Sequence, residues 1–323
     1  MTSGIVSKFV ENLRRDGLQQ TLGRVAKFGY RGPWYTLTSR YPIGTNIYER
    51  EWDILIILDA CRIDALREVA NEFDFVNSVD SMWSVGSTSH EWMAQTFTHQ
   101  WYEEISDTIY LTGNGFAQRT FIEGEEPGKN NNPFSFPNFS TVEKDDFKIL
   151  KGVWNTGHDD NLGNVPPRYI TDRAIELGRN HSTKRLIVHY NQPHTPYLSD
   201  AVNGSGTPAP FESDPFPLLR NGELSRDQAW NAYLDNLRLV LDEVKLLIEN
   251  IDAERVAISA DHGEAFGEWE QYGHPDASPI PAVKKVPWCE TTASDMNTHT
   301  PAEDTQQPTT DIESHLADLG YLN

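Results

Sequence analysis

Two short apolar runs in the sequence are followed by residues that can bind a metal ion. Residues 54–58 lead to Asp59, and residues 256–258, within the segment 255–259, lead to Asp261 and His262. A single acid after an apolar run could equally be the cap of the next helix. The repetition of the pattern favours a functional site, because core packing does not require acids there. Carboxylate and imidazole groups together suit a divalent ion such as zinc or manganese.

A third apolar run, residues 185–188, leads into a loop with a further histidine. His189 comes directly after this run, and His194 follows inside the Pro-bracketed segment 193–197. A histidine inside a strand is more often a core residue, and we interpret His189 in this way. His194 stays a candidate for the same site as the two acidic run ends.

The elements that must position these residues are short and rich in β-branched side chains. Such runs are typical of buried parallel strands. Further strands are expected at residues 108–111 and 149–154, and helices at 168–179 and after the capping box 225–228. Helices and strands therefore alternate, which predicts an α/β fold with a doubly wound, mostly parallel sheet. In such sheets ligands bind beyond the carboxyl ends of the strands, where the candidate residues lie.

Together these motifs resemble the sulfatase-like branch of the alkaline phosphatase superfamily, in the form typical of haloarchaeal proteins. They come in the family's order between residues 50 and 290. The resemblance implies a metal-dependent enzyme that cleaves phosphate or sulfate esters, on a doubly wound α/β fold flanked by helices. The motifs are Asp59 after its strand, Pro193-His194-Thr195-Pro196-Tyr197, and Asp261-His262-Gly263-Glu264 with Gly273-His274.

The resemblance also implies a metal site. Asp59, Asp261 and His262 would hold one divalent ion, which the sequence leaves open as Zn, Mn, Mg or Ca. Thr88 would be the fourth ligand, and the metal would lower the pKa of its hydroxyl so that it attacks as the nucleophile.

Other candidate residues surround this site. His194 and His274 match family positions that either bind the transferred group or complete a second metal site. Glu264 is expected to support the metal ligands from outside. Arg62 and Asp64 are expected to brace the turn after the first strand rather than to take part in the chemistry.

Three neighbouring hydroxyls, those of Ser87, Thr88 and Ser89, precede a helix expected from His90. Thr88 and Glu91 have capping-box spacing, so Thr88 is also predicted as the N-cap of this helix. A hydroxyl at a helix N-terminus lies among backbone N–H groups that suit a bound phosphoryl group. In the family the nucleophile lies on this turn, often with Pro two residues later. Thr88 fits, with His90 in place of Pro, and Ser87 and Ser89 are the alternatives.

The sequence departs from the sulfatases in two places. Residues 88–92 read Thr-Ser-His-Glu-Trp and lack the Cys/Ser-x-Pro-x-Arg motif whose first residue becomes formylglycine. Asp59 is followed by Ala60, where sulfatases usually carry a second acid. Both departures favour a phosphate ester, cleaved through a covalent Thr88 intermediate by a hydrolase or a phospho-group transferase. The alternative is a non-catalytic binding protein that keeps the fold.

The composition is strongly acidic. The 323 residues carry 48 acidic and 27 basic side chains, a formal net charge of -21. This charge argues against nucleic-acid binding, and acids spread along the whole chain are typical of a halophilic protein. An ordinary acidic protein is the alternative. The sequence has no secretory segment and no run of 18 apolar residues, which favours a cytoplasmic location. The expected substrate is a small-molecule, glycan-linked or lipid-linked phosphate or sulfate ester.

Three regions of the chain differ in composition. Residues 1–40 hold seven basic and two acidic side chains, a net charge of +5, with apolar residues near helical spacing. A basic amphipathic helix can lie peripherally on an anionic membrane, but the apolar face is narrow. We therefore expect this helical extension to pack on the acidic body of its own chain. Residues 41–290 form the expected catalytic domain, and residues 291–323 form a polar tail with a short helix at 312–322.

Overall fold

The computed structural model describes residues 29–129, 135–181, 184–303 and 312–319. Contacts divide the chain into two units, residues 1–42 with 126–139 and residues 43–125 with 140–323. In the first unit residues 29–38 are helical, and the Phe136 N–H donates a hydrogen bond to Thr36 Oγ1 at 2.9 Å. Most of the basic N-terminal extension lies outside the described residues. Its packing and its membrane contact therefore stay predictions.

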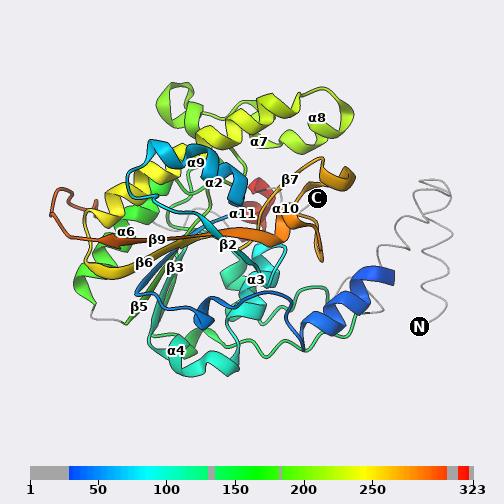
Figure 1. Cartoon of the computed structure of the whole chain (residues 1–323), viewed down its shortest axis with the longest axis horizontal. Helices are drawn as coiled ribbons and strands as arrows, with labels where there is room; N and C mark the ends of the chain where they lie inside the picture. Colours follow the sequence, from blue (N-terminus) through cyan, green and yellow to red (C-terminus); the bar gives the residue numbers. More distant parts are fainter. Residues whose placement is uncertain (1–28, 130–134, 182–183, 304–311, 320–323) are drawn as a thin grey trace. The chain divides into compact units, whose positions relative to one another are not determined.

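The larger unit is built on a seven-stranded sheet with the order β2-β9-β6-β1-β5-β3-β4 (Figure 1). Strand β9 runs antiparallel to both of its neighbours, and the other pairs are parallel. This mostly parallel sheet confirms the predicted fold class. The strands are β1 (Ile54–Leu58), β2 (Asp80–Trp83), β3 (Thr108–Thr112), β4 (Ile149–Gly152), β5 (Arg185–Tyr190), β6 (Ala253–Ser259) and β9 (Lys285–Ala293), with a separate hairpin of β7 (Ala265–Phe266) and β8 (Tyr272–Gly273).

Helices cover both faces of this sheet. Figure 1 shows α2, α6 and α9 on one face and α3 and α4 on the other. None of the helices in the described part of the chain has the length and hydropathy needed to cross a bilayer. The helices are α2 (Ile63–Val69), α3 (Ser89–Thr96), α4 (Tyr102–Ser106), α5 (Phe116–Phe121), α6 (Pro167–Asn180), α7 (Pro210–Ser213), α8 (Pro215–Asn221), α9 (Arg226–Ile248), α10 (Pro281–Lys284) and α11 (Ile312–Asp318).

The central strands and long helices lie where their apolar patterns predict them. All five side chains of β1 are buried, with at most 5% of their surface exposed, because helices cover the sheet on both sides. The helix expected at 168–179 is α6. The expected capping box opens α9, where Ser225 Oγ accepts the N–H of Gln228 at 3.2 Å.

Strands β2 and β9 are two elements of the sheet that the sequence pattern does not predict. β9 pairs with β2 on one side and β6 on the other, and it extends past residue 290, where the polar tail was expected to begin. Pro287 lies inside it, opposite Ser81. Proline is rare within sheets because it has no N–H to donate, so its presence argues against a strand at this place.

The segment after β9 is held by side-chain contacts. Arg179 forms an ion pair with Asp295 at 2.8 Å, and His299 Nε2 lies 2.6 Å from Asp172 Oδ1. Side-chain contacts therefore hold the described residues of the expected polar tail that follow β9. Helix α11 begins at Ile312, where the terminal helix was expected.

Candidate metal centre and active site

The two acidic strand ends meet at one edge of the sheet. Strands β1 and β6 are parallel neighbours, with Ile57 opposite Ser259. Asp59 and Asp261 each lie two residues further along the chain. They are therefore at equivalent positions beyond the carboxyl ends of the two strands. Together with His262 they form a cluster whose ligand atoms lie within 4.8 Å of one another. The three side chains are 0–1% exposed, so three of the four predicted metal ligands form one buried group.

Ser89 is the hydroxyl that the structure brings to this cluster. Its Oγ lies 2.7 Å from Asp261 Oδ2, 3.3 Å from Asp59 Oδ2 and 3.4 Å from His262 Nε2. Ser89 is the first residue of α3, so its side chain also lies at the positive end of the helix dipole.

Thr88 and Ser87 have other partners. Thr88 Oγ1 accepts the backbone N–H of Glu91 at 3.2 Å, which confirms the prediction that it caps α3. Ser87 Oγ donates to the Glu91 carboxylate at 2.7 Å. No described contact joins the Thr88 side chain to the acidic cluster, where it was expected as the fourth ligand. Among the three hydroxyls that the sequence left open, Ser89 alone touches both acids in the described structure.

The donor set of the cluster fits a divalent cation. His262 Nδ1 lies 2.9 Å from the Gly263 carbonyl, so it carries the proton and Nε2 carries the lone pair. This lone pair faces Asp59 Oδ1 and Asp261 Oδ2, each at 3.5 Å. Three acceptors would thus face one another in a buried space, which is unfavourable without a cation. Ligands bound tetrahedrally at about 2.1 Å are about 3.4 Å apart, close to these distances.

The electrostatics keep these groups in the form that binds a metal. Burial alone would raise the pKa of Asp261, but the contacts of its carboxylate with the His189 imidazole and the Ser89 hydroxyl lower it below its usual range. Burial lowers the pKa of His262, which favours the neutral ring. An ionised carboxylate beside a neutral imidazole is the usual protein ligand set of zinc.

A second cluster adjoins the first and contains His194, Glu264 and His274, with ligand atoms within 4.8 Å of one another. His274 Nδ1 lies 2.9 Å from Glu264 Oε1, and His194 Nδ1 lies 2.7 Å from the Thr195 carbonyl. The rings of His262 and His274 are 4.5 Å apart. Burial lowers the pKa of both His194 and His274 to about 4 and raises that of Glu264 to about 7. The two predicted histidines therefore lie beside the metal site as neutral rings.

Two residues of the site were not identified as such in the sequence. Asn114 Nδ2 donates to Asp59 Oδ2 at 2.9 Å. Asn114 lies two residues beyond the end of β3, so its place at a strand end was the available signal. His189 was predicted as a core residue, and it is fully buried. Its Nε2 nevertheless lies only 3.6 Å from Asp261 Oδ2.

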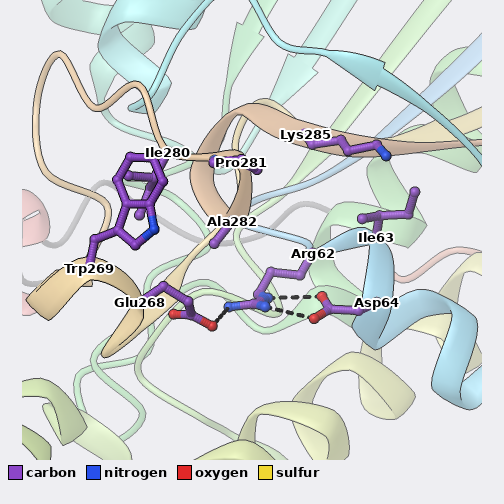
Figure 2. A pocket seen from close by; sticks show the side chains of 9 residues that line it. All are labelled: Arg62, Ile63, Asp64, Glu268, Trp269, Ile280, Pro281, Ala282 and Lys285. Atoms are coloured by element: carbon purple, nitrogen blue, oxygen red, sulfur yellow. Dashed lines mark hydrogen bonds and ion pairs between the residues drawn. The ribbon is translucent and has the colours of Figure 1, made fainter.

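Arg62 braces the turn after β1, as predicted. Its guanidinium donates two hydrogen bonds to Asp64, at 2.9 and 2.6 Å, and one to Glu268 at 2.8 Å (Figure 2). A further N–H donates to the Glu264 carbonyl at 2.9 Å. Arg62, Asp64 and Glu268 also line a pocket of about 360 Å³. Figure 2 shows its lining residues, Trp269 among them. Arg62 thus ties the β1 turn to the loop that carries Glu264.

No model of a known protein family matches the sequence, and no curated protein matches it. The chain is similar to the soluble domain of lipooligosaccharide phosphoethanolamine transferase A from Neisseria meningitidis, with 13% identity over 84% of this chain and 85% of that one and a TM-score of 0.42. A putative sulfatase from Bacteroides thetaiotaomicron is 12% identical over 83% and 70% of the two chains, with a TM-score of 0.39. A member of the alkaline phosphatase superfamily from Vibrio parahaemolyticus is 13% identical over 76% and 61%, with a TM-score of 0.41. These similarities concern the fold.

Proposed function

We propose that this protein is a metal-dependent enzyme of the sulfatase-like type that transfers the phosphoryl group of an ester to Ser89. The observation that carries the proposal is the position of Ser89 Oγ, within 3.4 Å of two buried carboxylates and an imidazole. A serine with only a structural role does not need two ionisable acids and a neutral histidine around its hydroxyl. The nucleophile proposed from the structure is therefore Ser89 in place of Thr88.

Asp59, Asp261 and His262 are the residues that would hold the ion. A divalent ion bound there supplies the positive charge that lowers the pKa of a nearby hydroxyl and stabilises negative charge on the phosphoryl oxygens. The protein itself orients the nucleophile, because the N-cap contact of Thr88 fixes the first turn of α3 and therefore the direction of Ser89. The positive end of the α3 dipole favours the anionic group that would be transferred.

The proposed reaction forms a bond between Ser89 Oγ and phosphorus while the ester P–O bond breaks. The serine proton leaves to water, and the departing alcohol takes up a proton from water. A second water then releases inorganic phosphate from Ser89, or an acceptor alcohol takes the phosphoryl group. Hydrolase and transferase share this first half and differ only in the final acceptor.

The tautomers of His194 and His274 favour a second ion over direct binding of the transferred group. In both rings Nδ1 faces an acceptor, a carbonyl or a carboxylate, and so carries the proton. The remaining ring nitrogen is then a lone-pair atom, which binds a cation and repels an anionic phosphoryl oxygen. With Glu264 these rings make a second donor set of the kind that zinc prefers.

We therefore expect purified protein to hold two divalent ions per chain. Glu264→Gln should lower the content to one, because the amide is a much weaker ligand than the carboxylate. Glu268→Gln is the matched control, since Glu268 pairs with Arg62 outside both clusters. Elemental analysis by plasma mass spectrometry after dialysis gives the count. One ion in both wild type and Glu264→Gln would show that the two histidines bind the substrate instead.

The ester class is tested with paired aryl phosphate and aryl sulfate esters that share one leaving group, assayed in high salt with metal added. We expect a higher kcat/KM for the phosphate. The reason is that no formylglycine motif starts at Ser89 either, since Glu91 and Met93 stand where that motif has Pro and Arg. A better sulfate substrate would contradict the choice of ester, and metal-loaded protein without turnover of any ester would favour a binding protein.

A further inference from the structure

His189 of β5 lies directly against the two acids of the metal centre. Its Nε2 is 3.6 Å from Asp261 Oδ2 and 4.0 Å from Asp59 Oδ2, and all three side chains are buried. Its Nδ1 is 2.8 Å from the hydroxyl of Tyr110 on the neighbouring strand β3. Trp92 and Tyr110 flank the ring, with ring centroids 5.6 and 6.2 Å away. The imidazole is therefore held in one place with one edge toward the carboxylates.

The contacts decide which ring nitrogen carries the proton. The Tyr110 hydroxyl can donate its proton to Nδ1, and the proton of a neutral ring then lies on Nε2. The opposite tautomer would direct the Nε2 lone pair at two buried carboxylates, which is strongly unfavourable. The Nε2–H thus faces Asp59 and Asp261.

We propose that His189 is a positioning residue for both metal-binding carboxylates, with Tyr110 fixing its tautomer. The two Oδ2 atoms that it faces are also the carboxylate oxygens that lie 3.3 and 2.7 Å from Ser89 Oγ. The other oxygen of Asp261, Oδ1, is already held by the backbone N–H groups of Ala60 and His262.

When Ser89 reacts, the His189 N–H is the side-chain donor that still faces Asp261. The serine hydroxyl donates to Asp261 Oδ2 only while it keeps its proton, and the proposed reaction removes that proton. The His189 N–H still faces Asp261 Oδ2 after this step. This part of the inference rests on the proposed role of Ser89, whereas the effect of His189 on metal affinity does not.

The test compares three replacements of His189 by their affinity for Zn²⁺, titrated calorimetrically into metal-stripped full-length protein in the absence of substrate. A glutamine amide reaches about the place of the imidazole Nε2 and can donate to the carboxylates, whereas an asparagine amide reaches only about the place of Nδ1. We expect His189→Gln to stay within about threefold of wild type and His189→Asn and His189→Phe to bind roughly 10–100-fold more weakly, the usual loss when an outer-shell partner is removed.

Two tyrosine variants separate positioning from packing. Tyr110→Phe removes the hydroxyl that fixes the tautomer, so we expect it to weaken Zn²⁺ binding less than the His189→Phe change. Tyr190→Phe is the matched control. Tyr190 follows His189 on β5, and its buried hydroxyl lies 2.8 Å from Thr171 Oγ1, away from both clusters. Its loss should lower the melting temperature of the metal-free protein and leave Zn²⁺ affinity unchanged.

Equal Zn²⁺ affinity in wild type, His189→Asn and His189→Phe would overturn the inference, and so would a His189→Gln variant as weak as His189→Phe. Melting temperatures of the metal-free variants show whether each is folded, and the Gln–Asn comparison stays valid at matched stability. Failure of the proposed function has a different signature. It would appear as normal Zn²⁺ binding with no turnover of any ester, so the two outcomes cannot be confused.

Discussion

Ser89→Ala is expected to lower turnover of the preferred ester by several orders of magnitude, because it removes both the covalent step and the hydroxyl that contacts the metal ligands. The loss should be in kcat at saturating metal, with the protein still folded. Steady-state kinetics with added metal measure it. Mass spectrometry of acid-quenched wild type should find a phosphorylated peptide that contains Ser89.

Thr88→Ala is the matched control for this change, since it removes a hydroxyl one residue away. The Thr88 hydroxyl accepts the Glu91 N–H as an N-cap, so its loss should cost about 1 kcal/mol of stability and leave most of the turnover. A fully active, folded Ser89→Ala variant would rule out Ser89. If Thr88→Ala instead lost turnover at unchanged stability, Thr88 would be the nucleophile.

Asp261→Ala should remove the ion of the first cluster. Asp261 Oδ1 is held by two backbone N–H groups, and Oδ2 faces Ser89 and His262. The carboxylate of Asp59 already belongs to the same cluster, and that of Glu264 belongs to the second one. Elemental analysis should therefore find at least one ion fewer per chain than in wild type, and turnover should disappear with it.

The melting temperature provides a second readout of the same change. An ion that binds only the folded protein stabilises it by mass action, so a chelator should lower the melting temperature of wild type. The chelator should have a smaller effect on Asp261→Ala. Asp64→Asn is the control acid, because Asp64 pairs with Arg62 on the same turn and touches neither cluster. Equal metal content in wild type and Asp261→Ala would refute the metal assignment.

The sequence by itself determined the central parallel strands of the sheet and the identity of their acidic ends. A strand buried on both faces must be apolar along its whole length, as in β1, and this makes it visible without a structure. Ligand sites of parallel sheets lie beyond the carboxyl ends of such strands, so Asp59, Asp261 and His262 could be assigned to one site from their positions alone. The two histidines beside this site, His194 and His274, were also predictable. They lie in motifs that come in the same order as in the family that the sequence resembles.

Only the tertiary structure decided which hydroxyl and which supporting residues complete the site. The N-terminus of α3 lies beside the acids that follow β1 and β6, so Ser89, its first residue, touches them. Thr88 has extended backbone angles as the N-cap, and its hydroxyl accepts the Glu91 N–H instead. Asn114 and His189 reach Asp59 and Asp261 from neighbouring parts of the sheet, over contacts between residues far apart in the sequence. Such contacts depend on strand order and register, which no local pattern of residue types encodes.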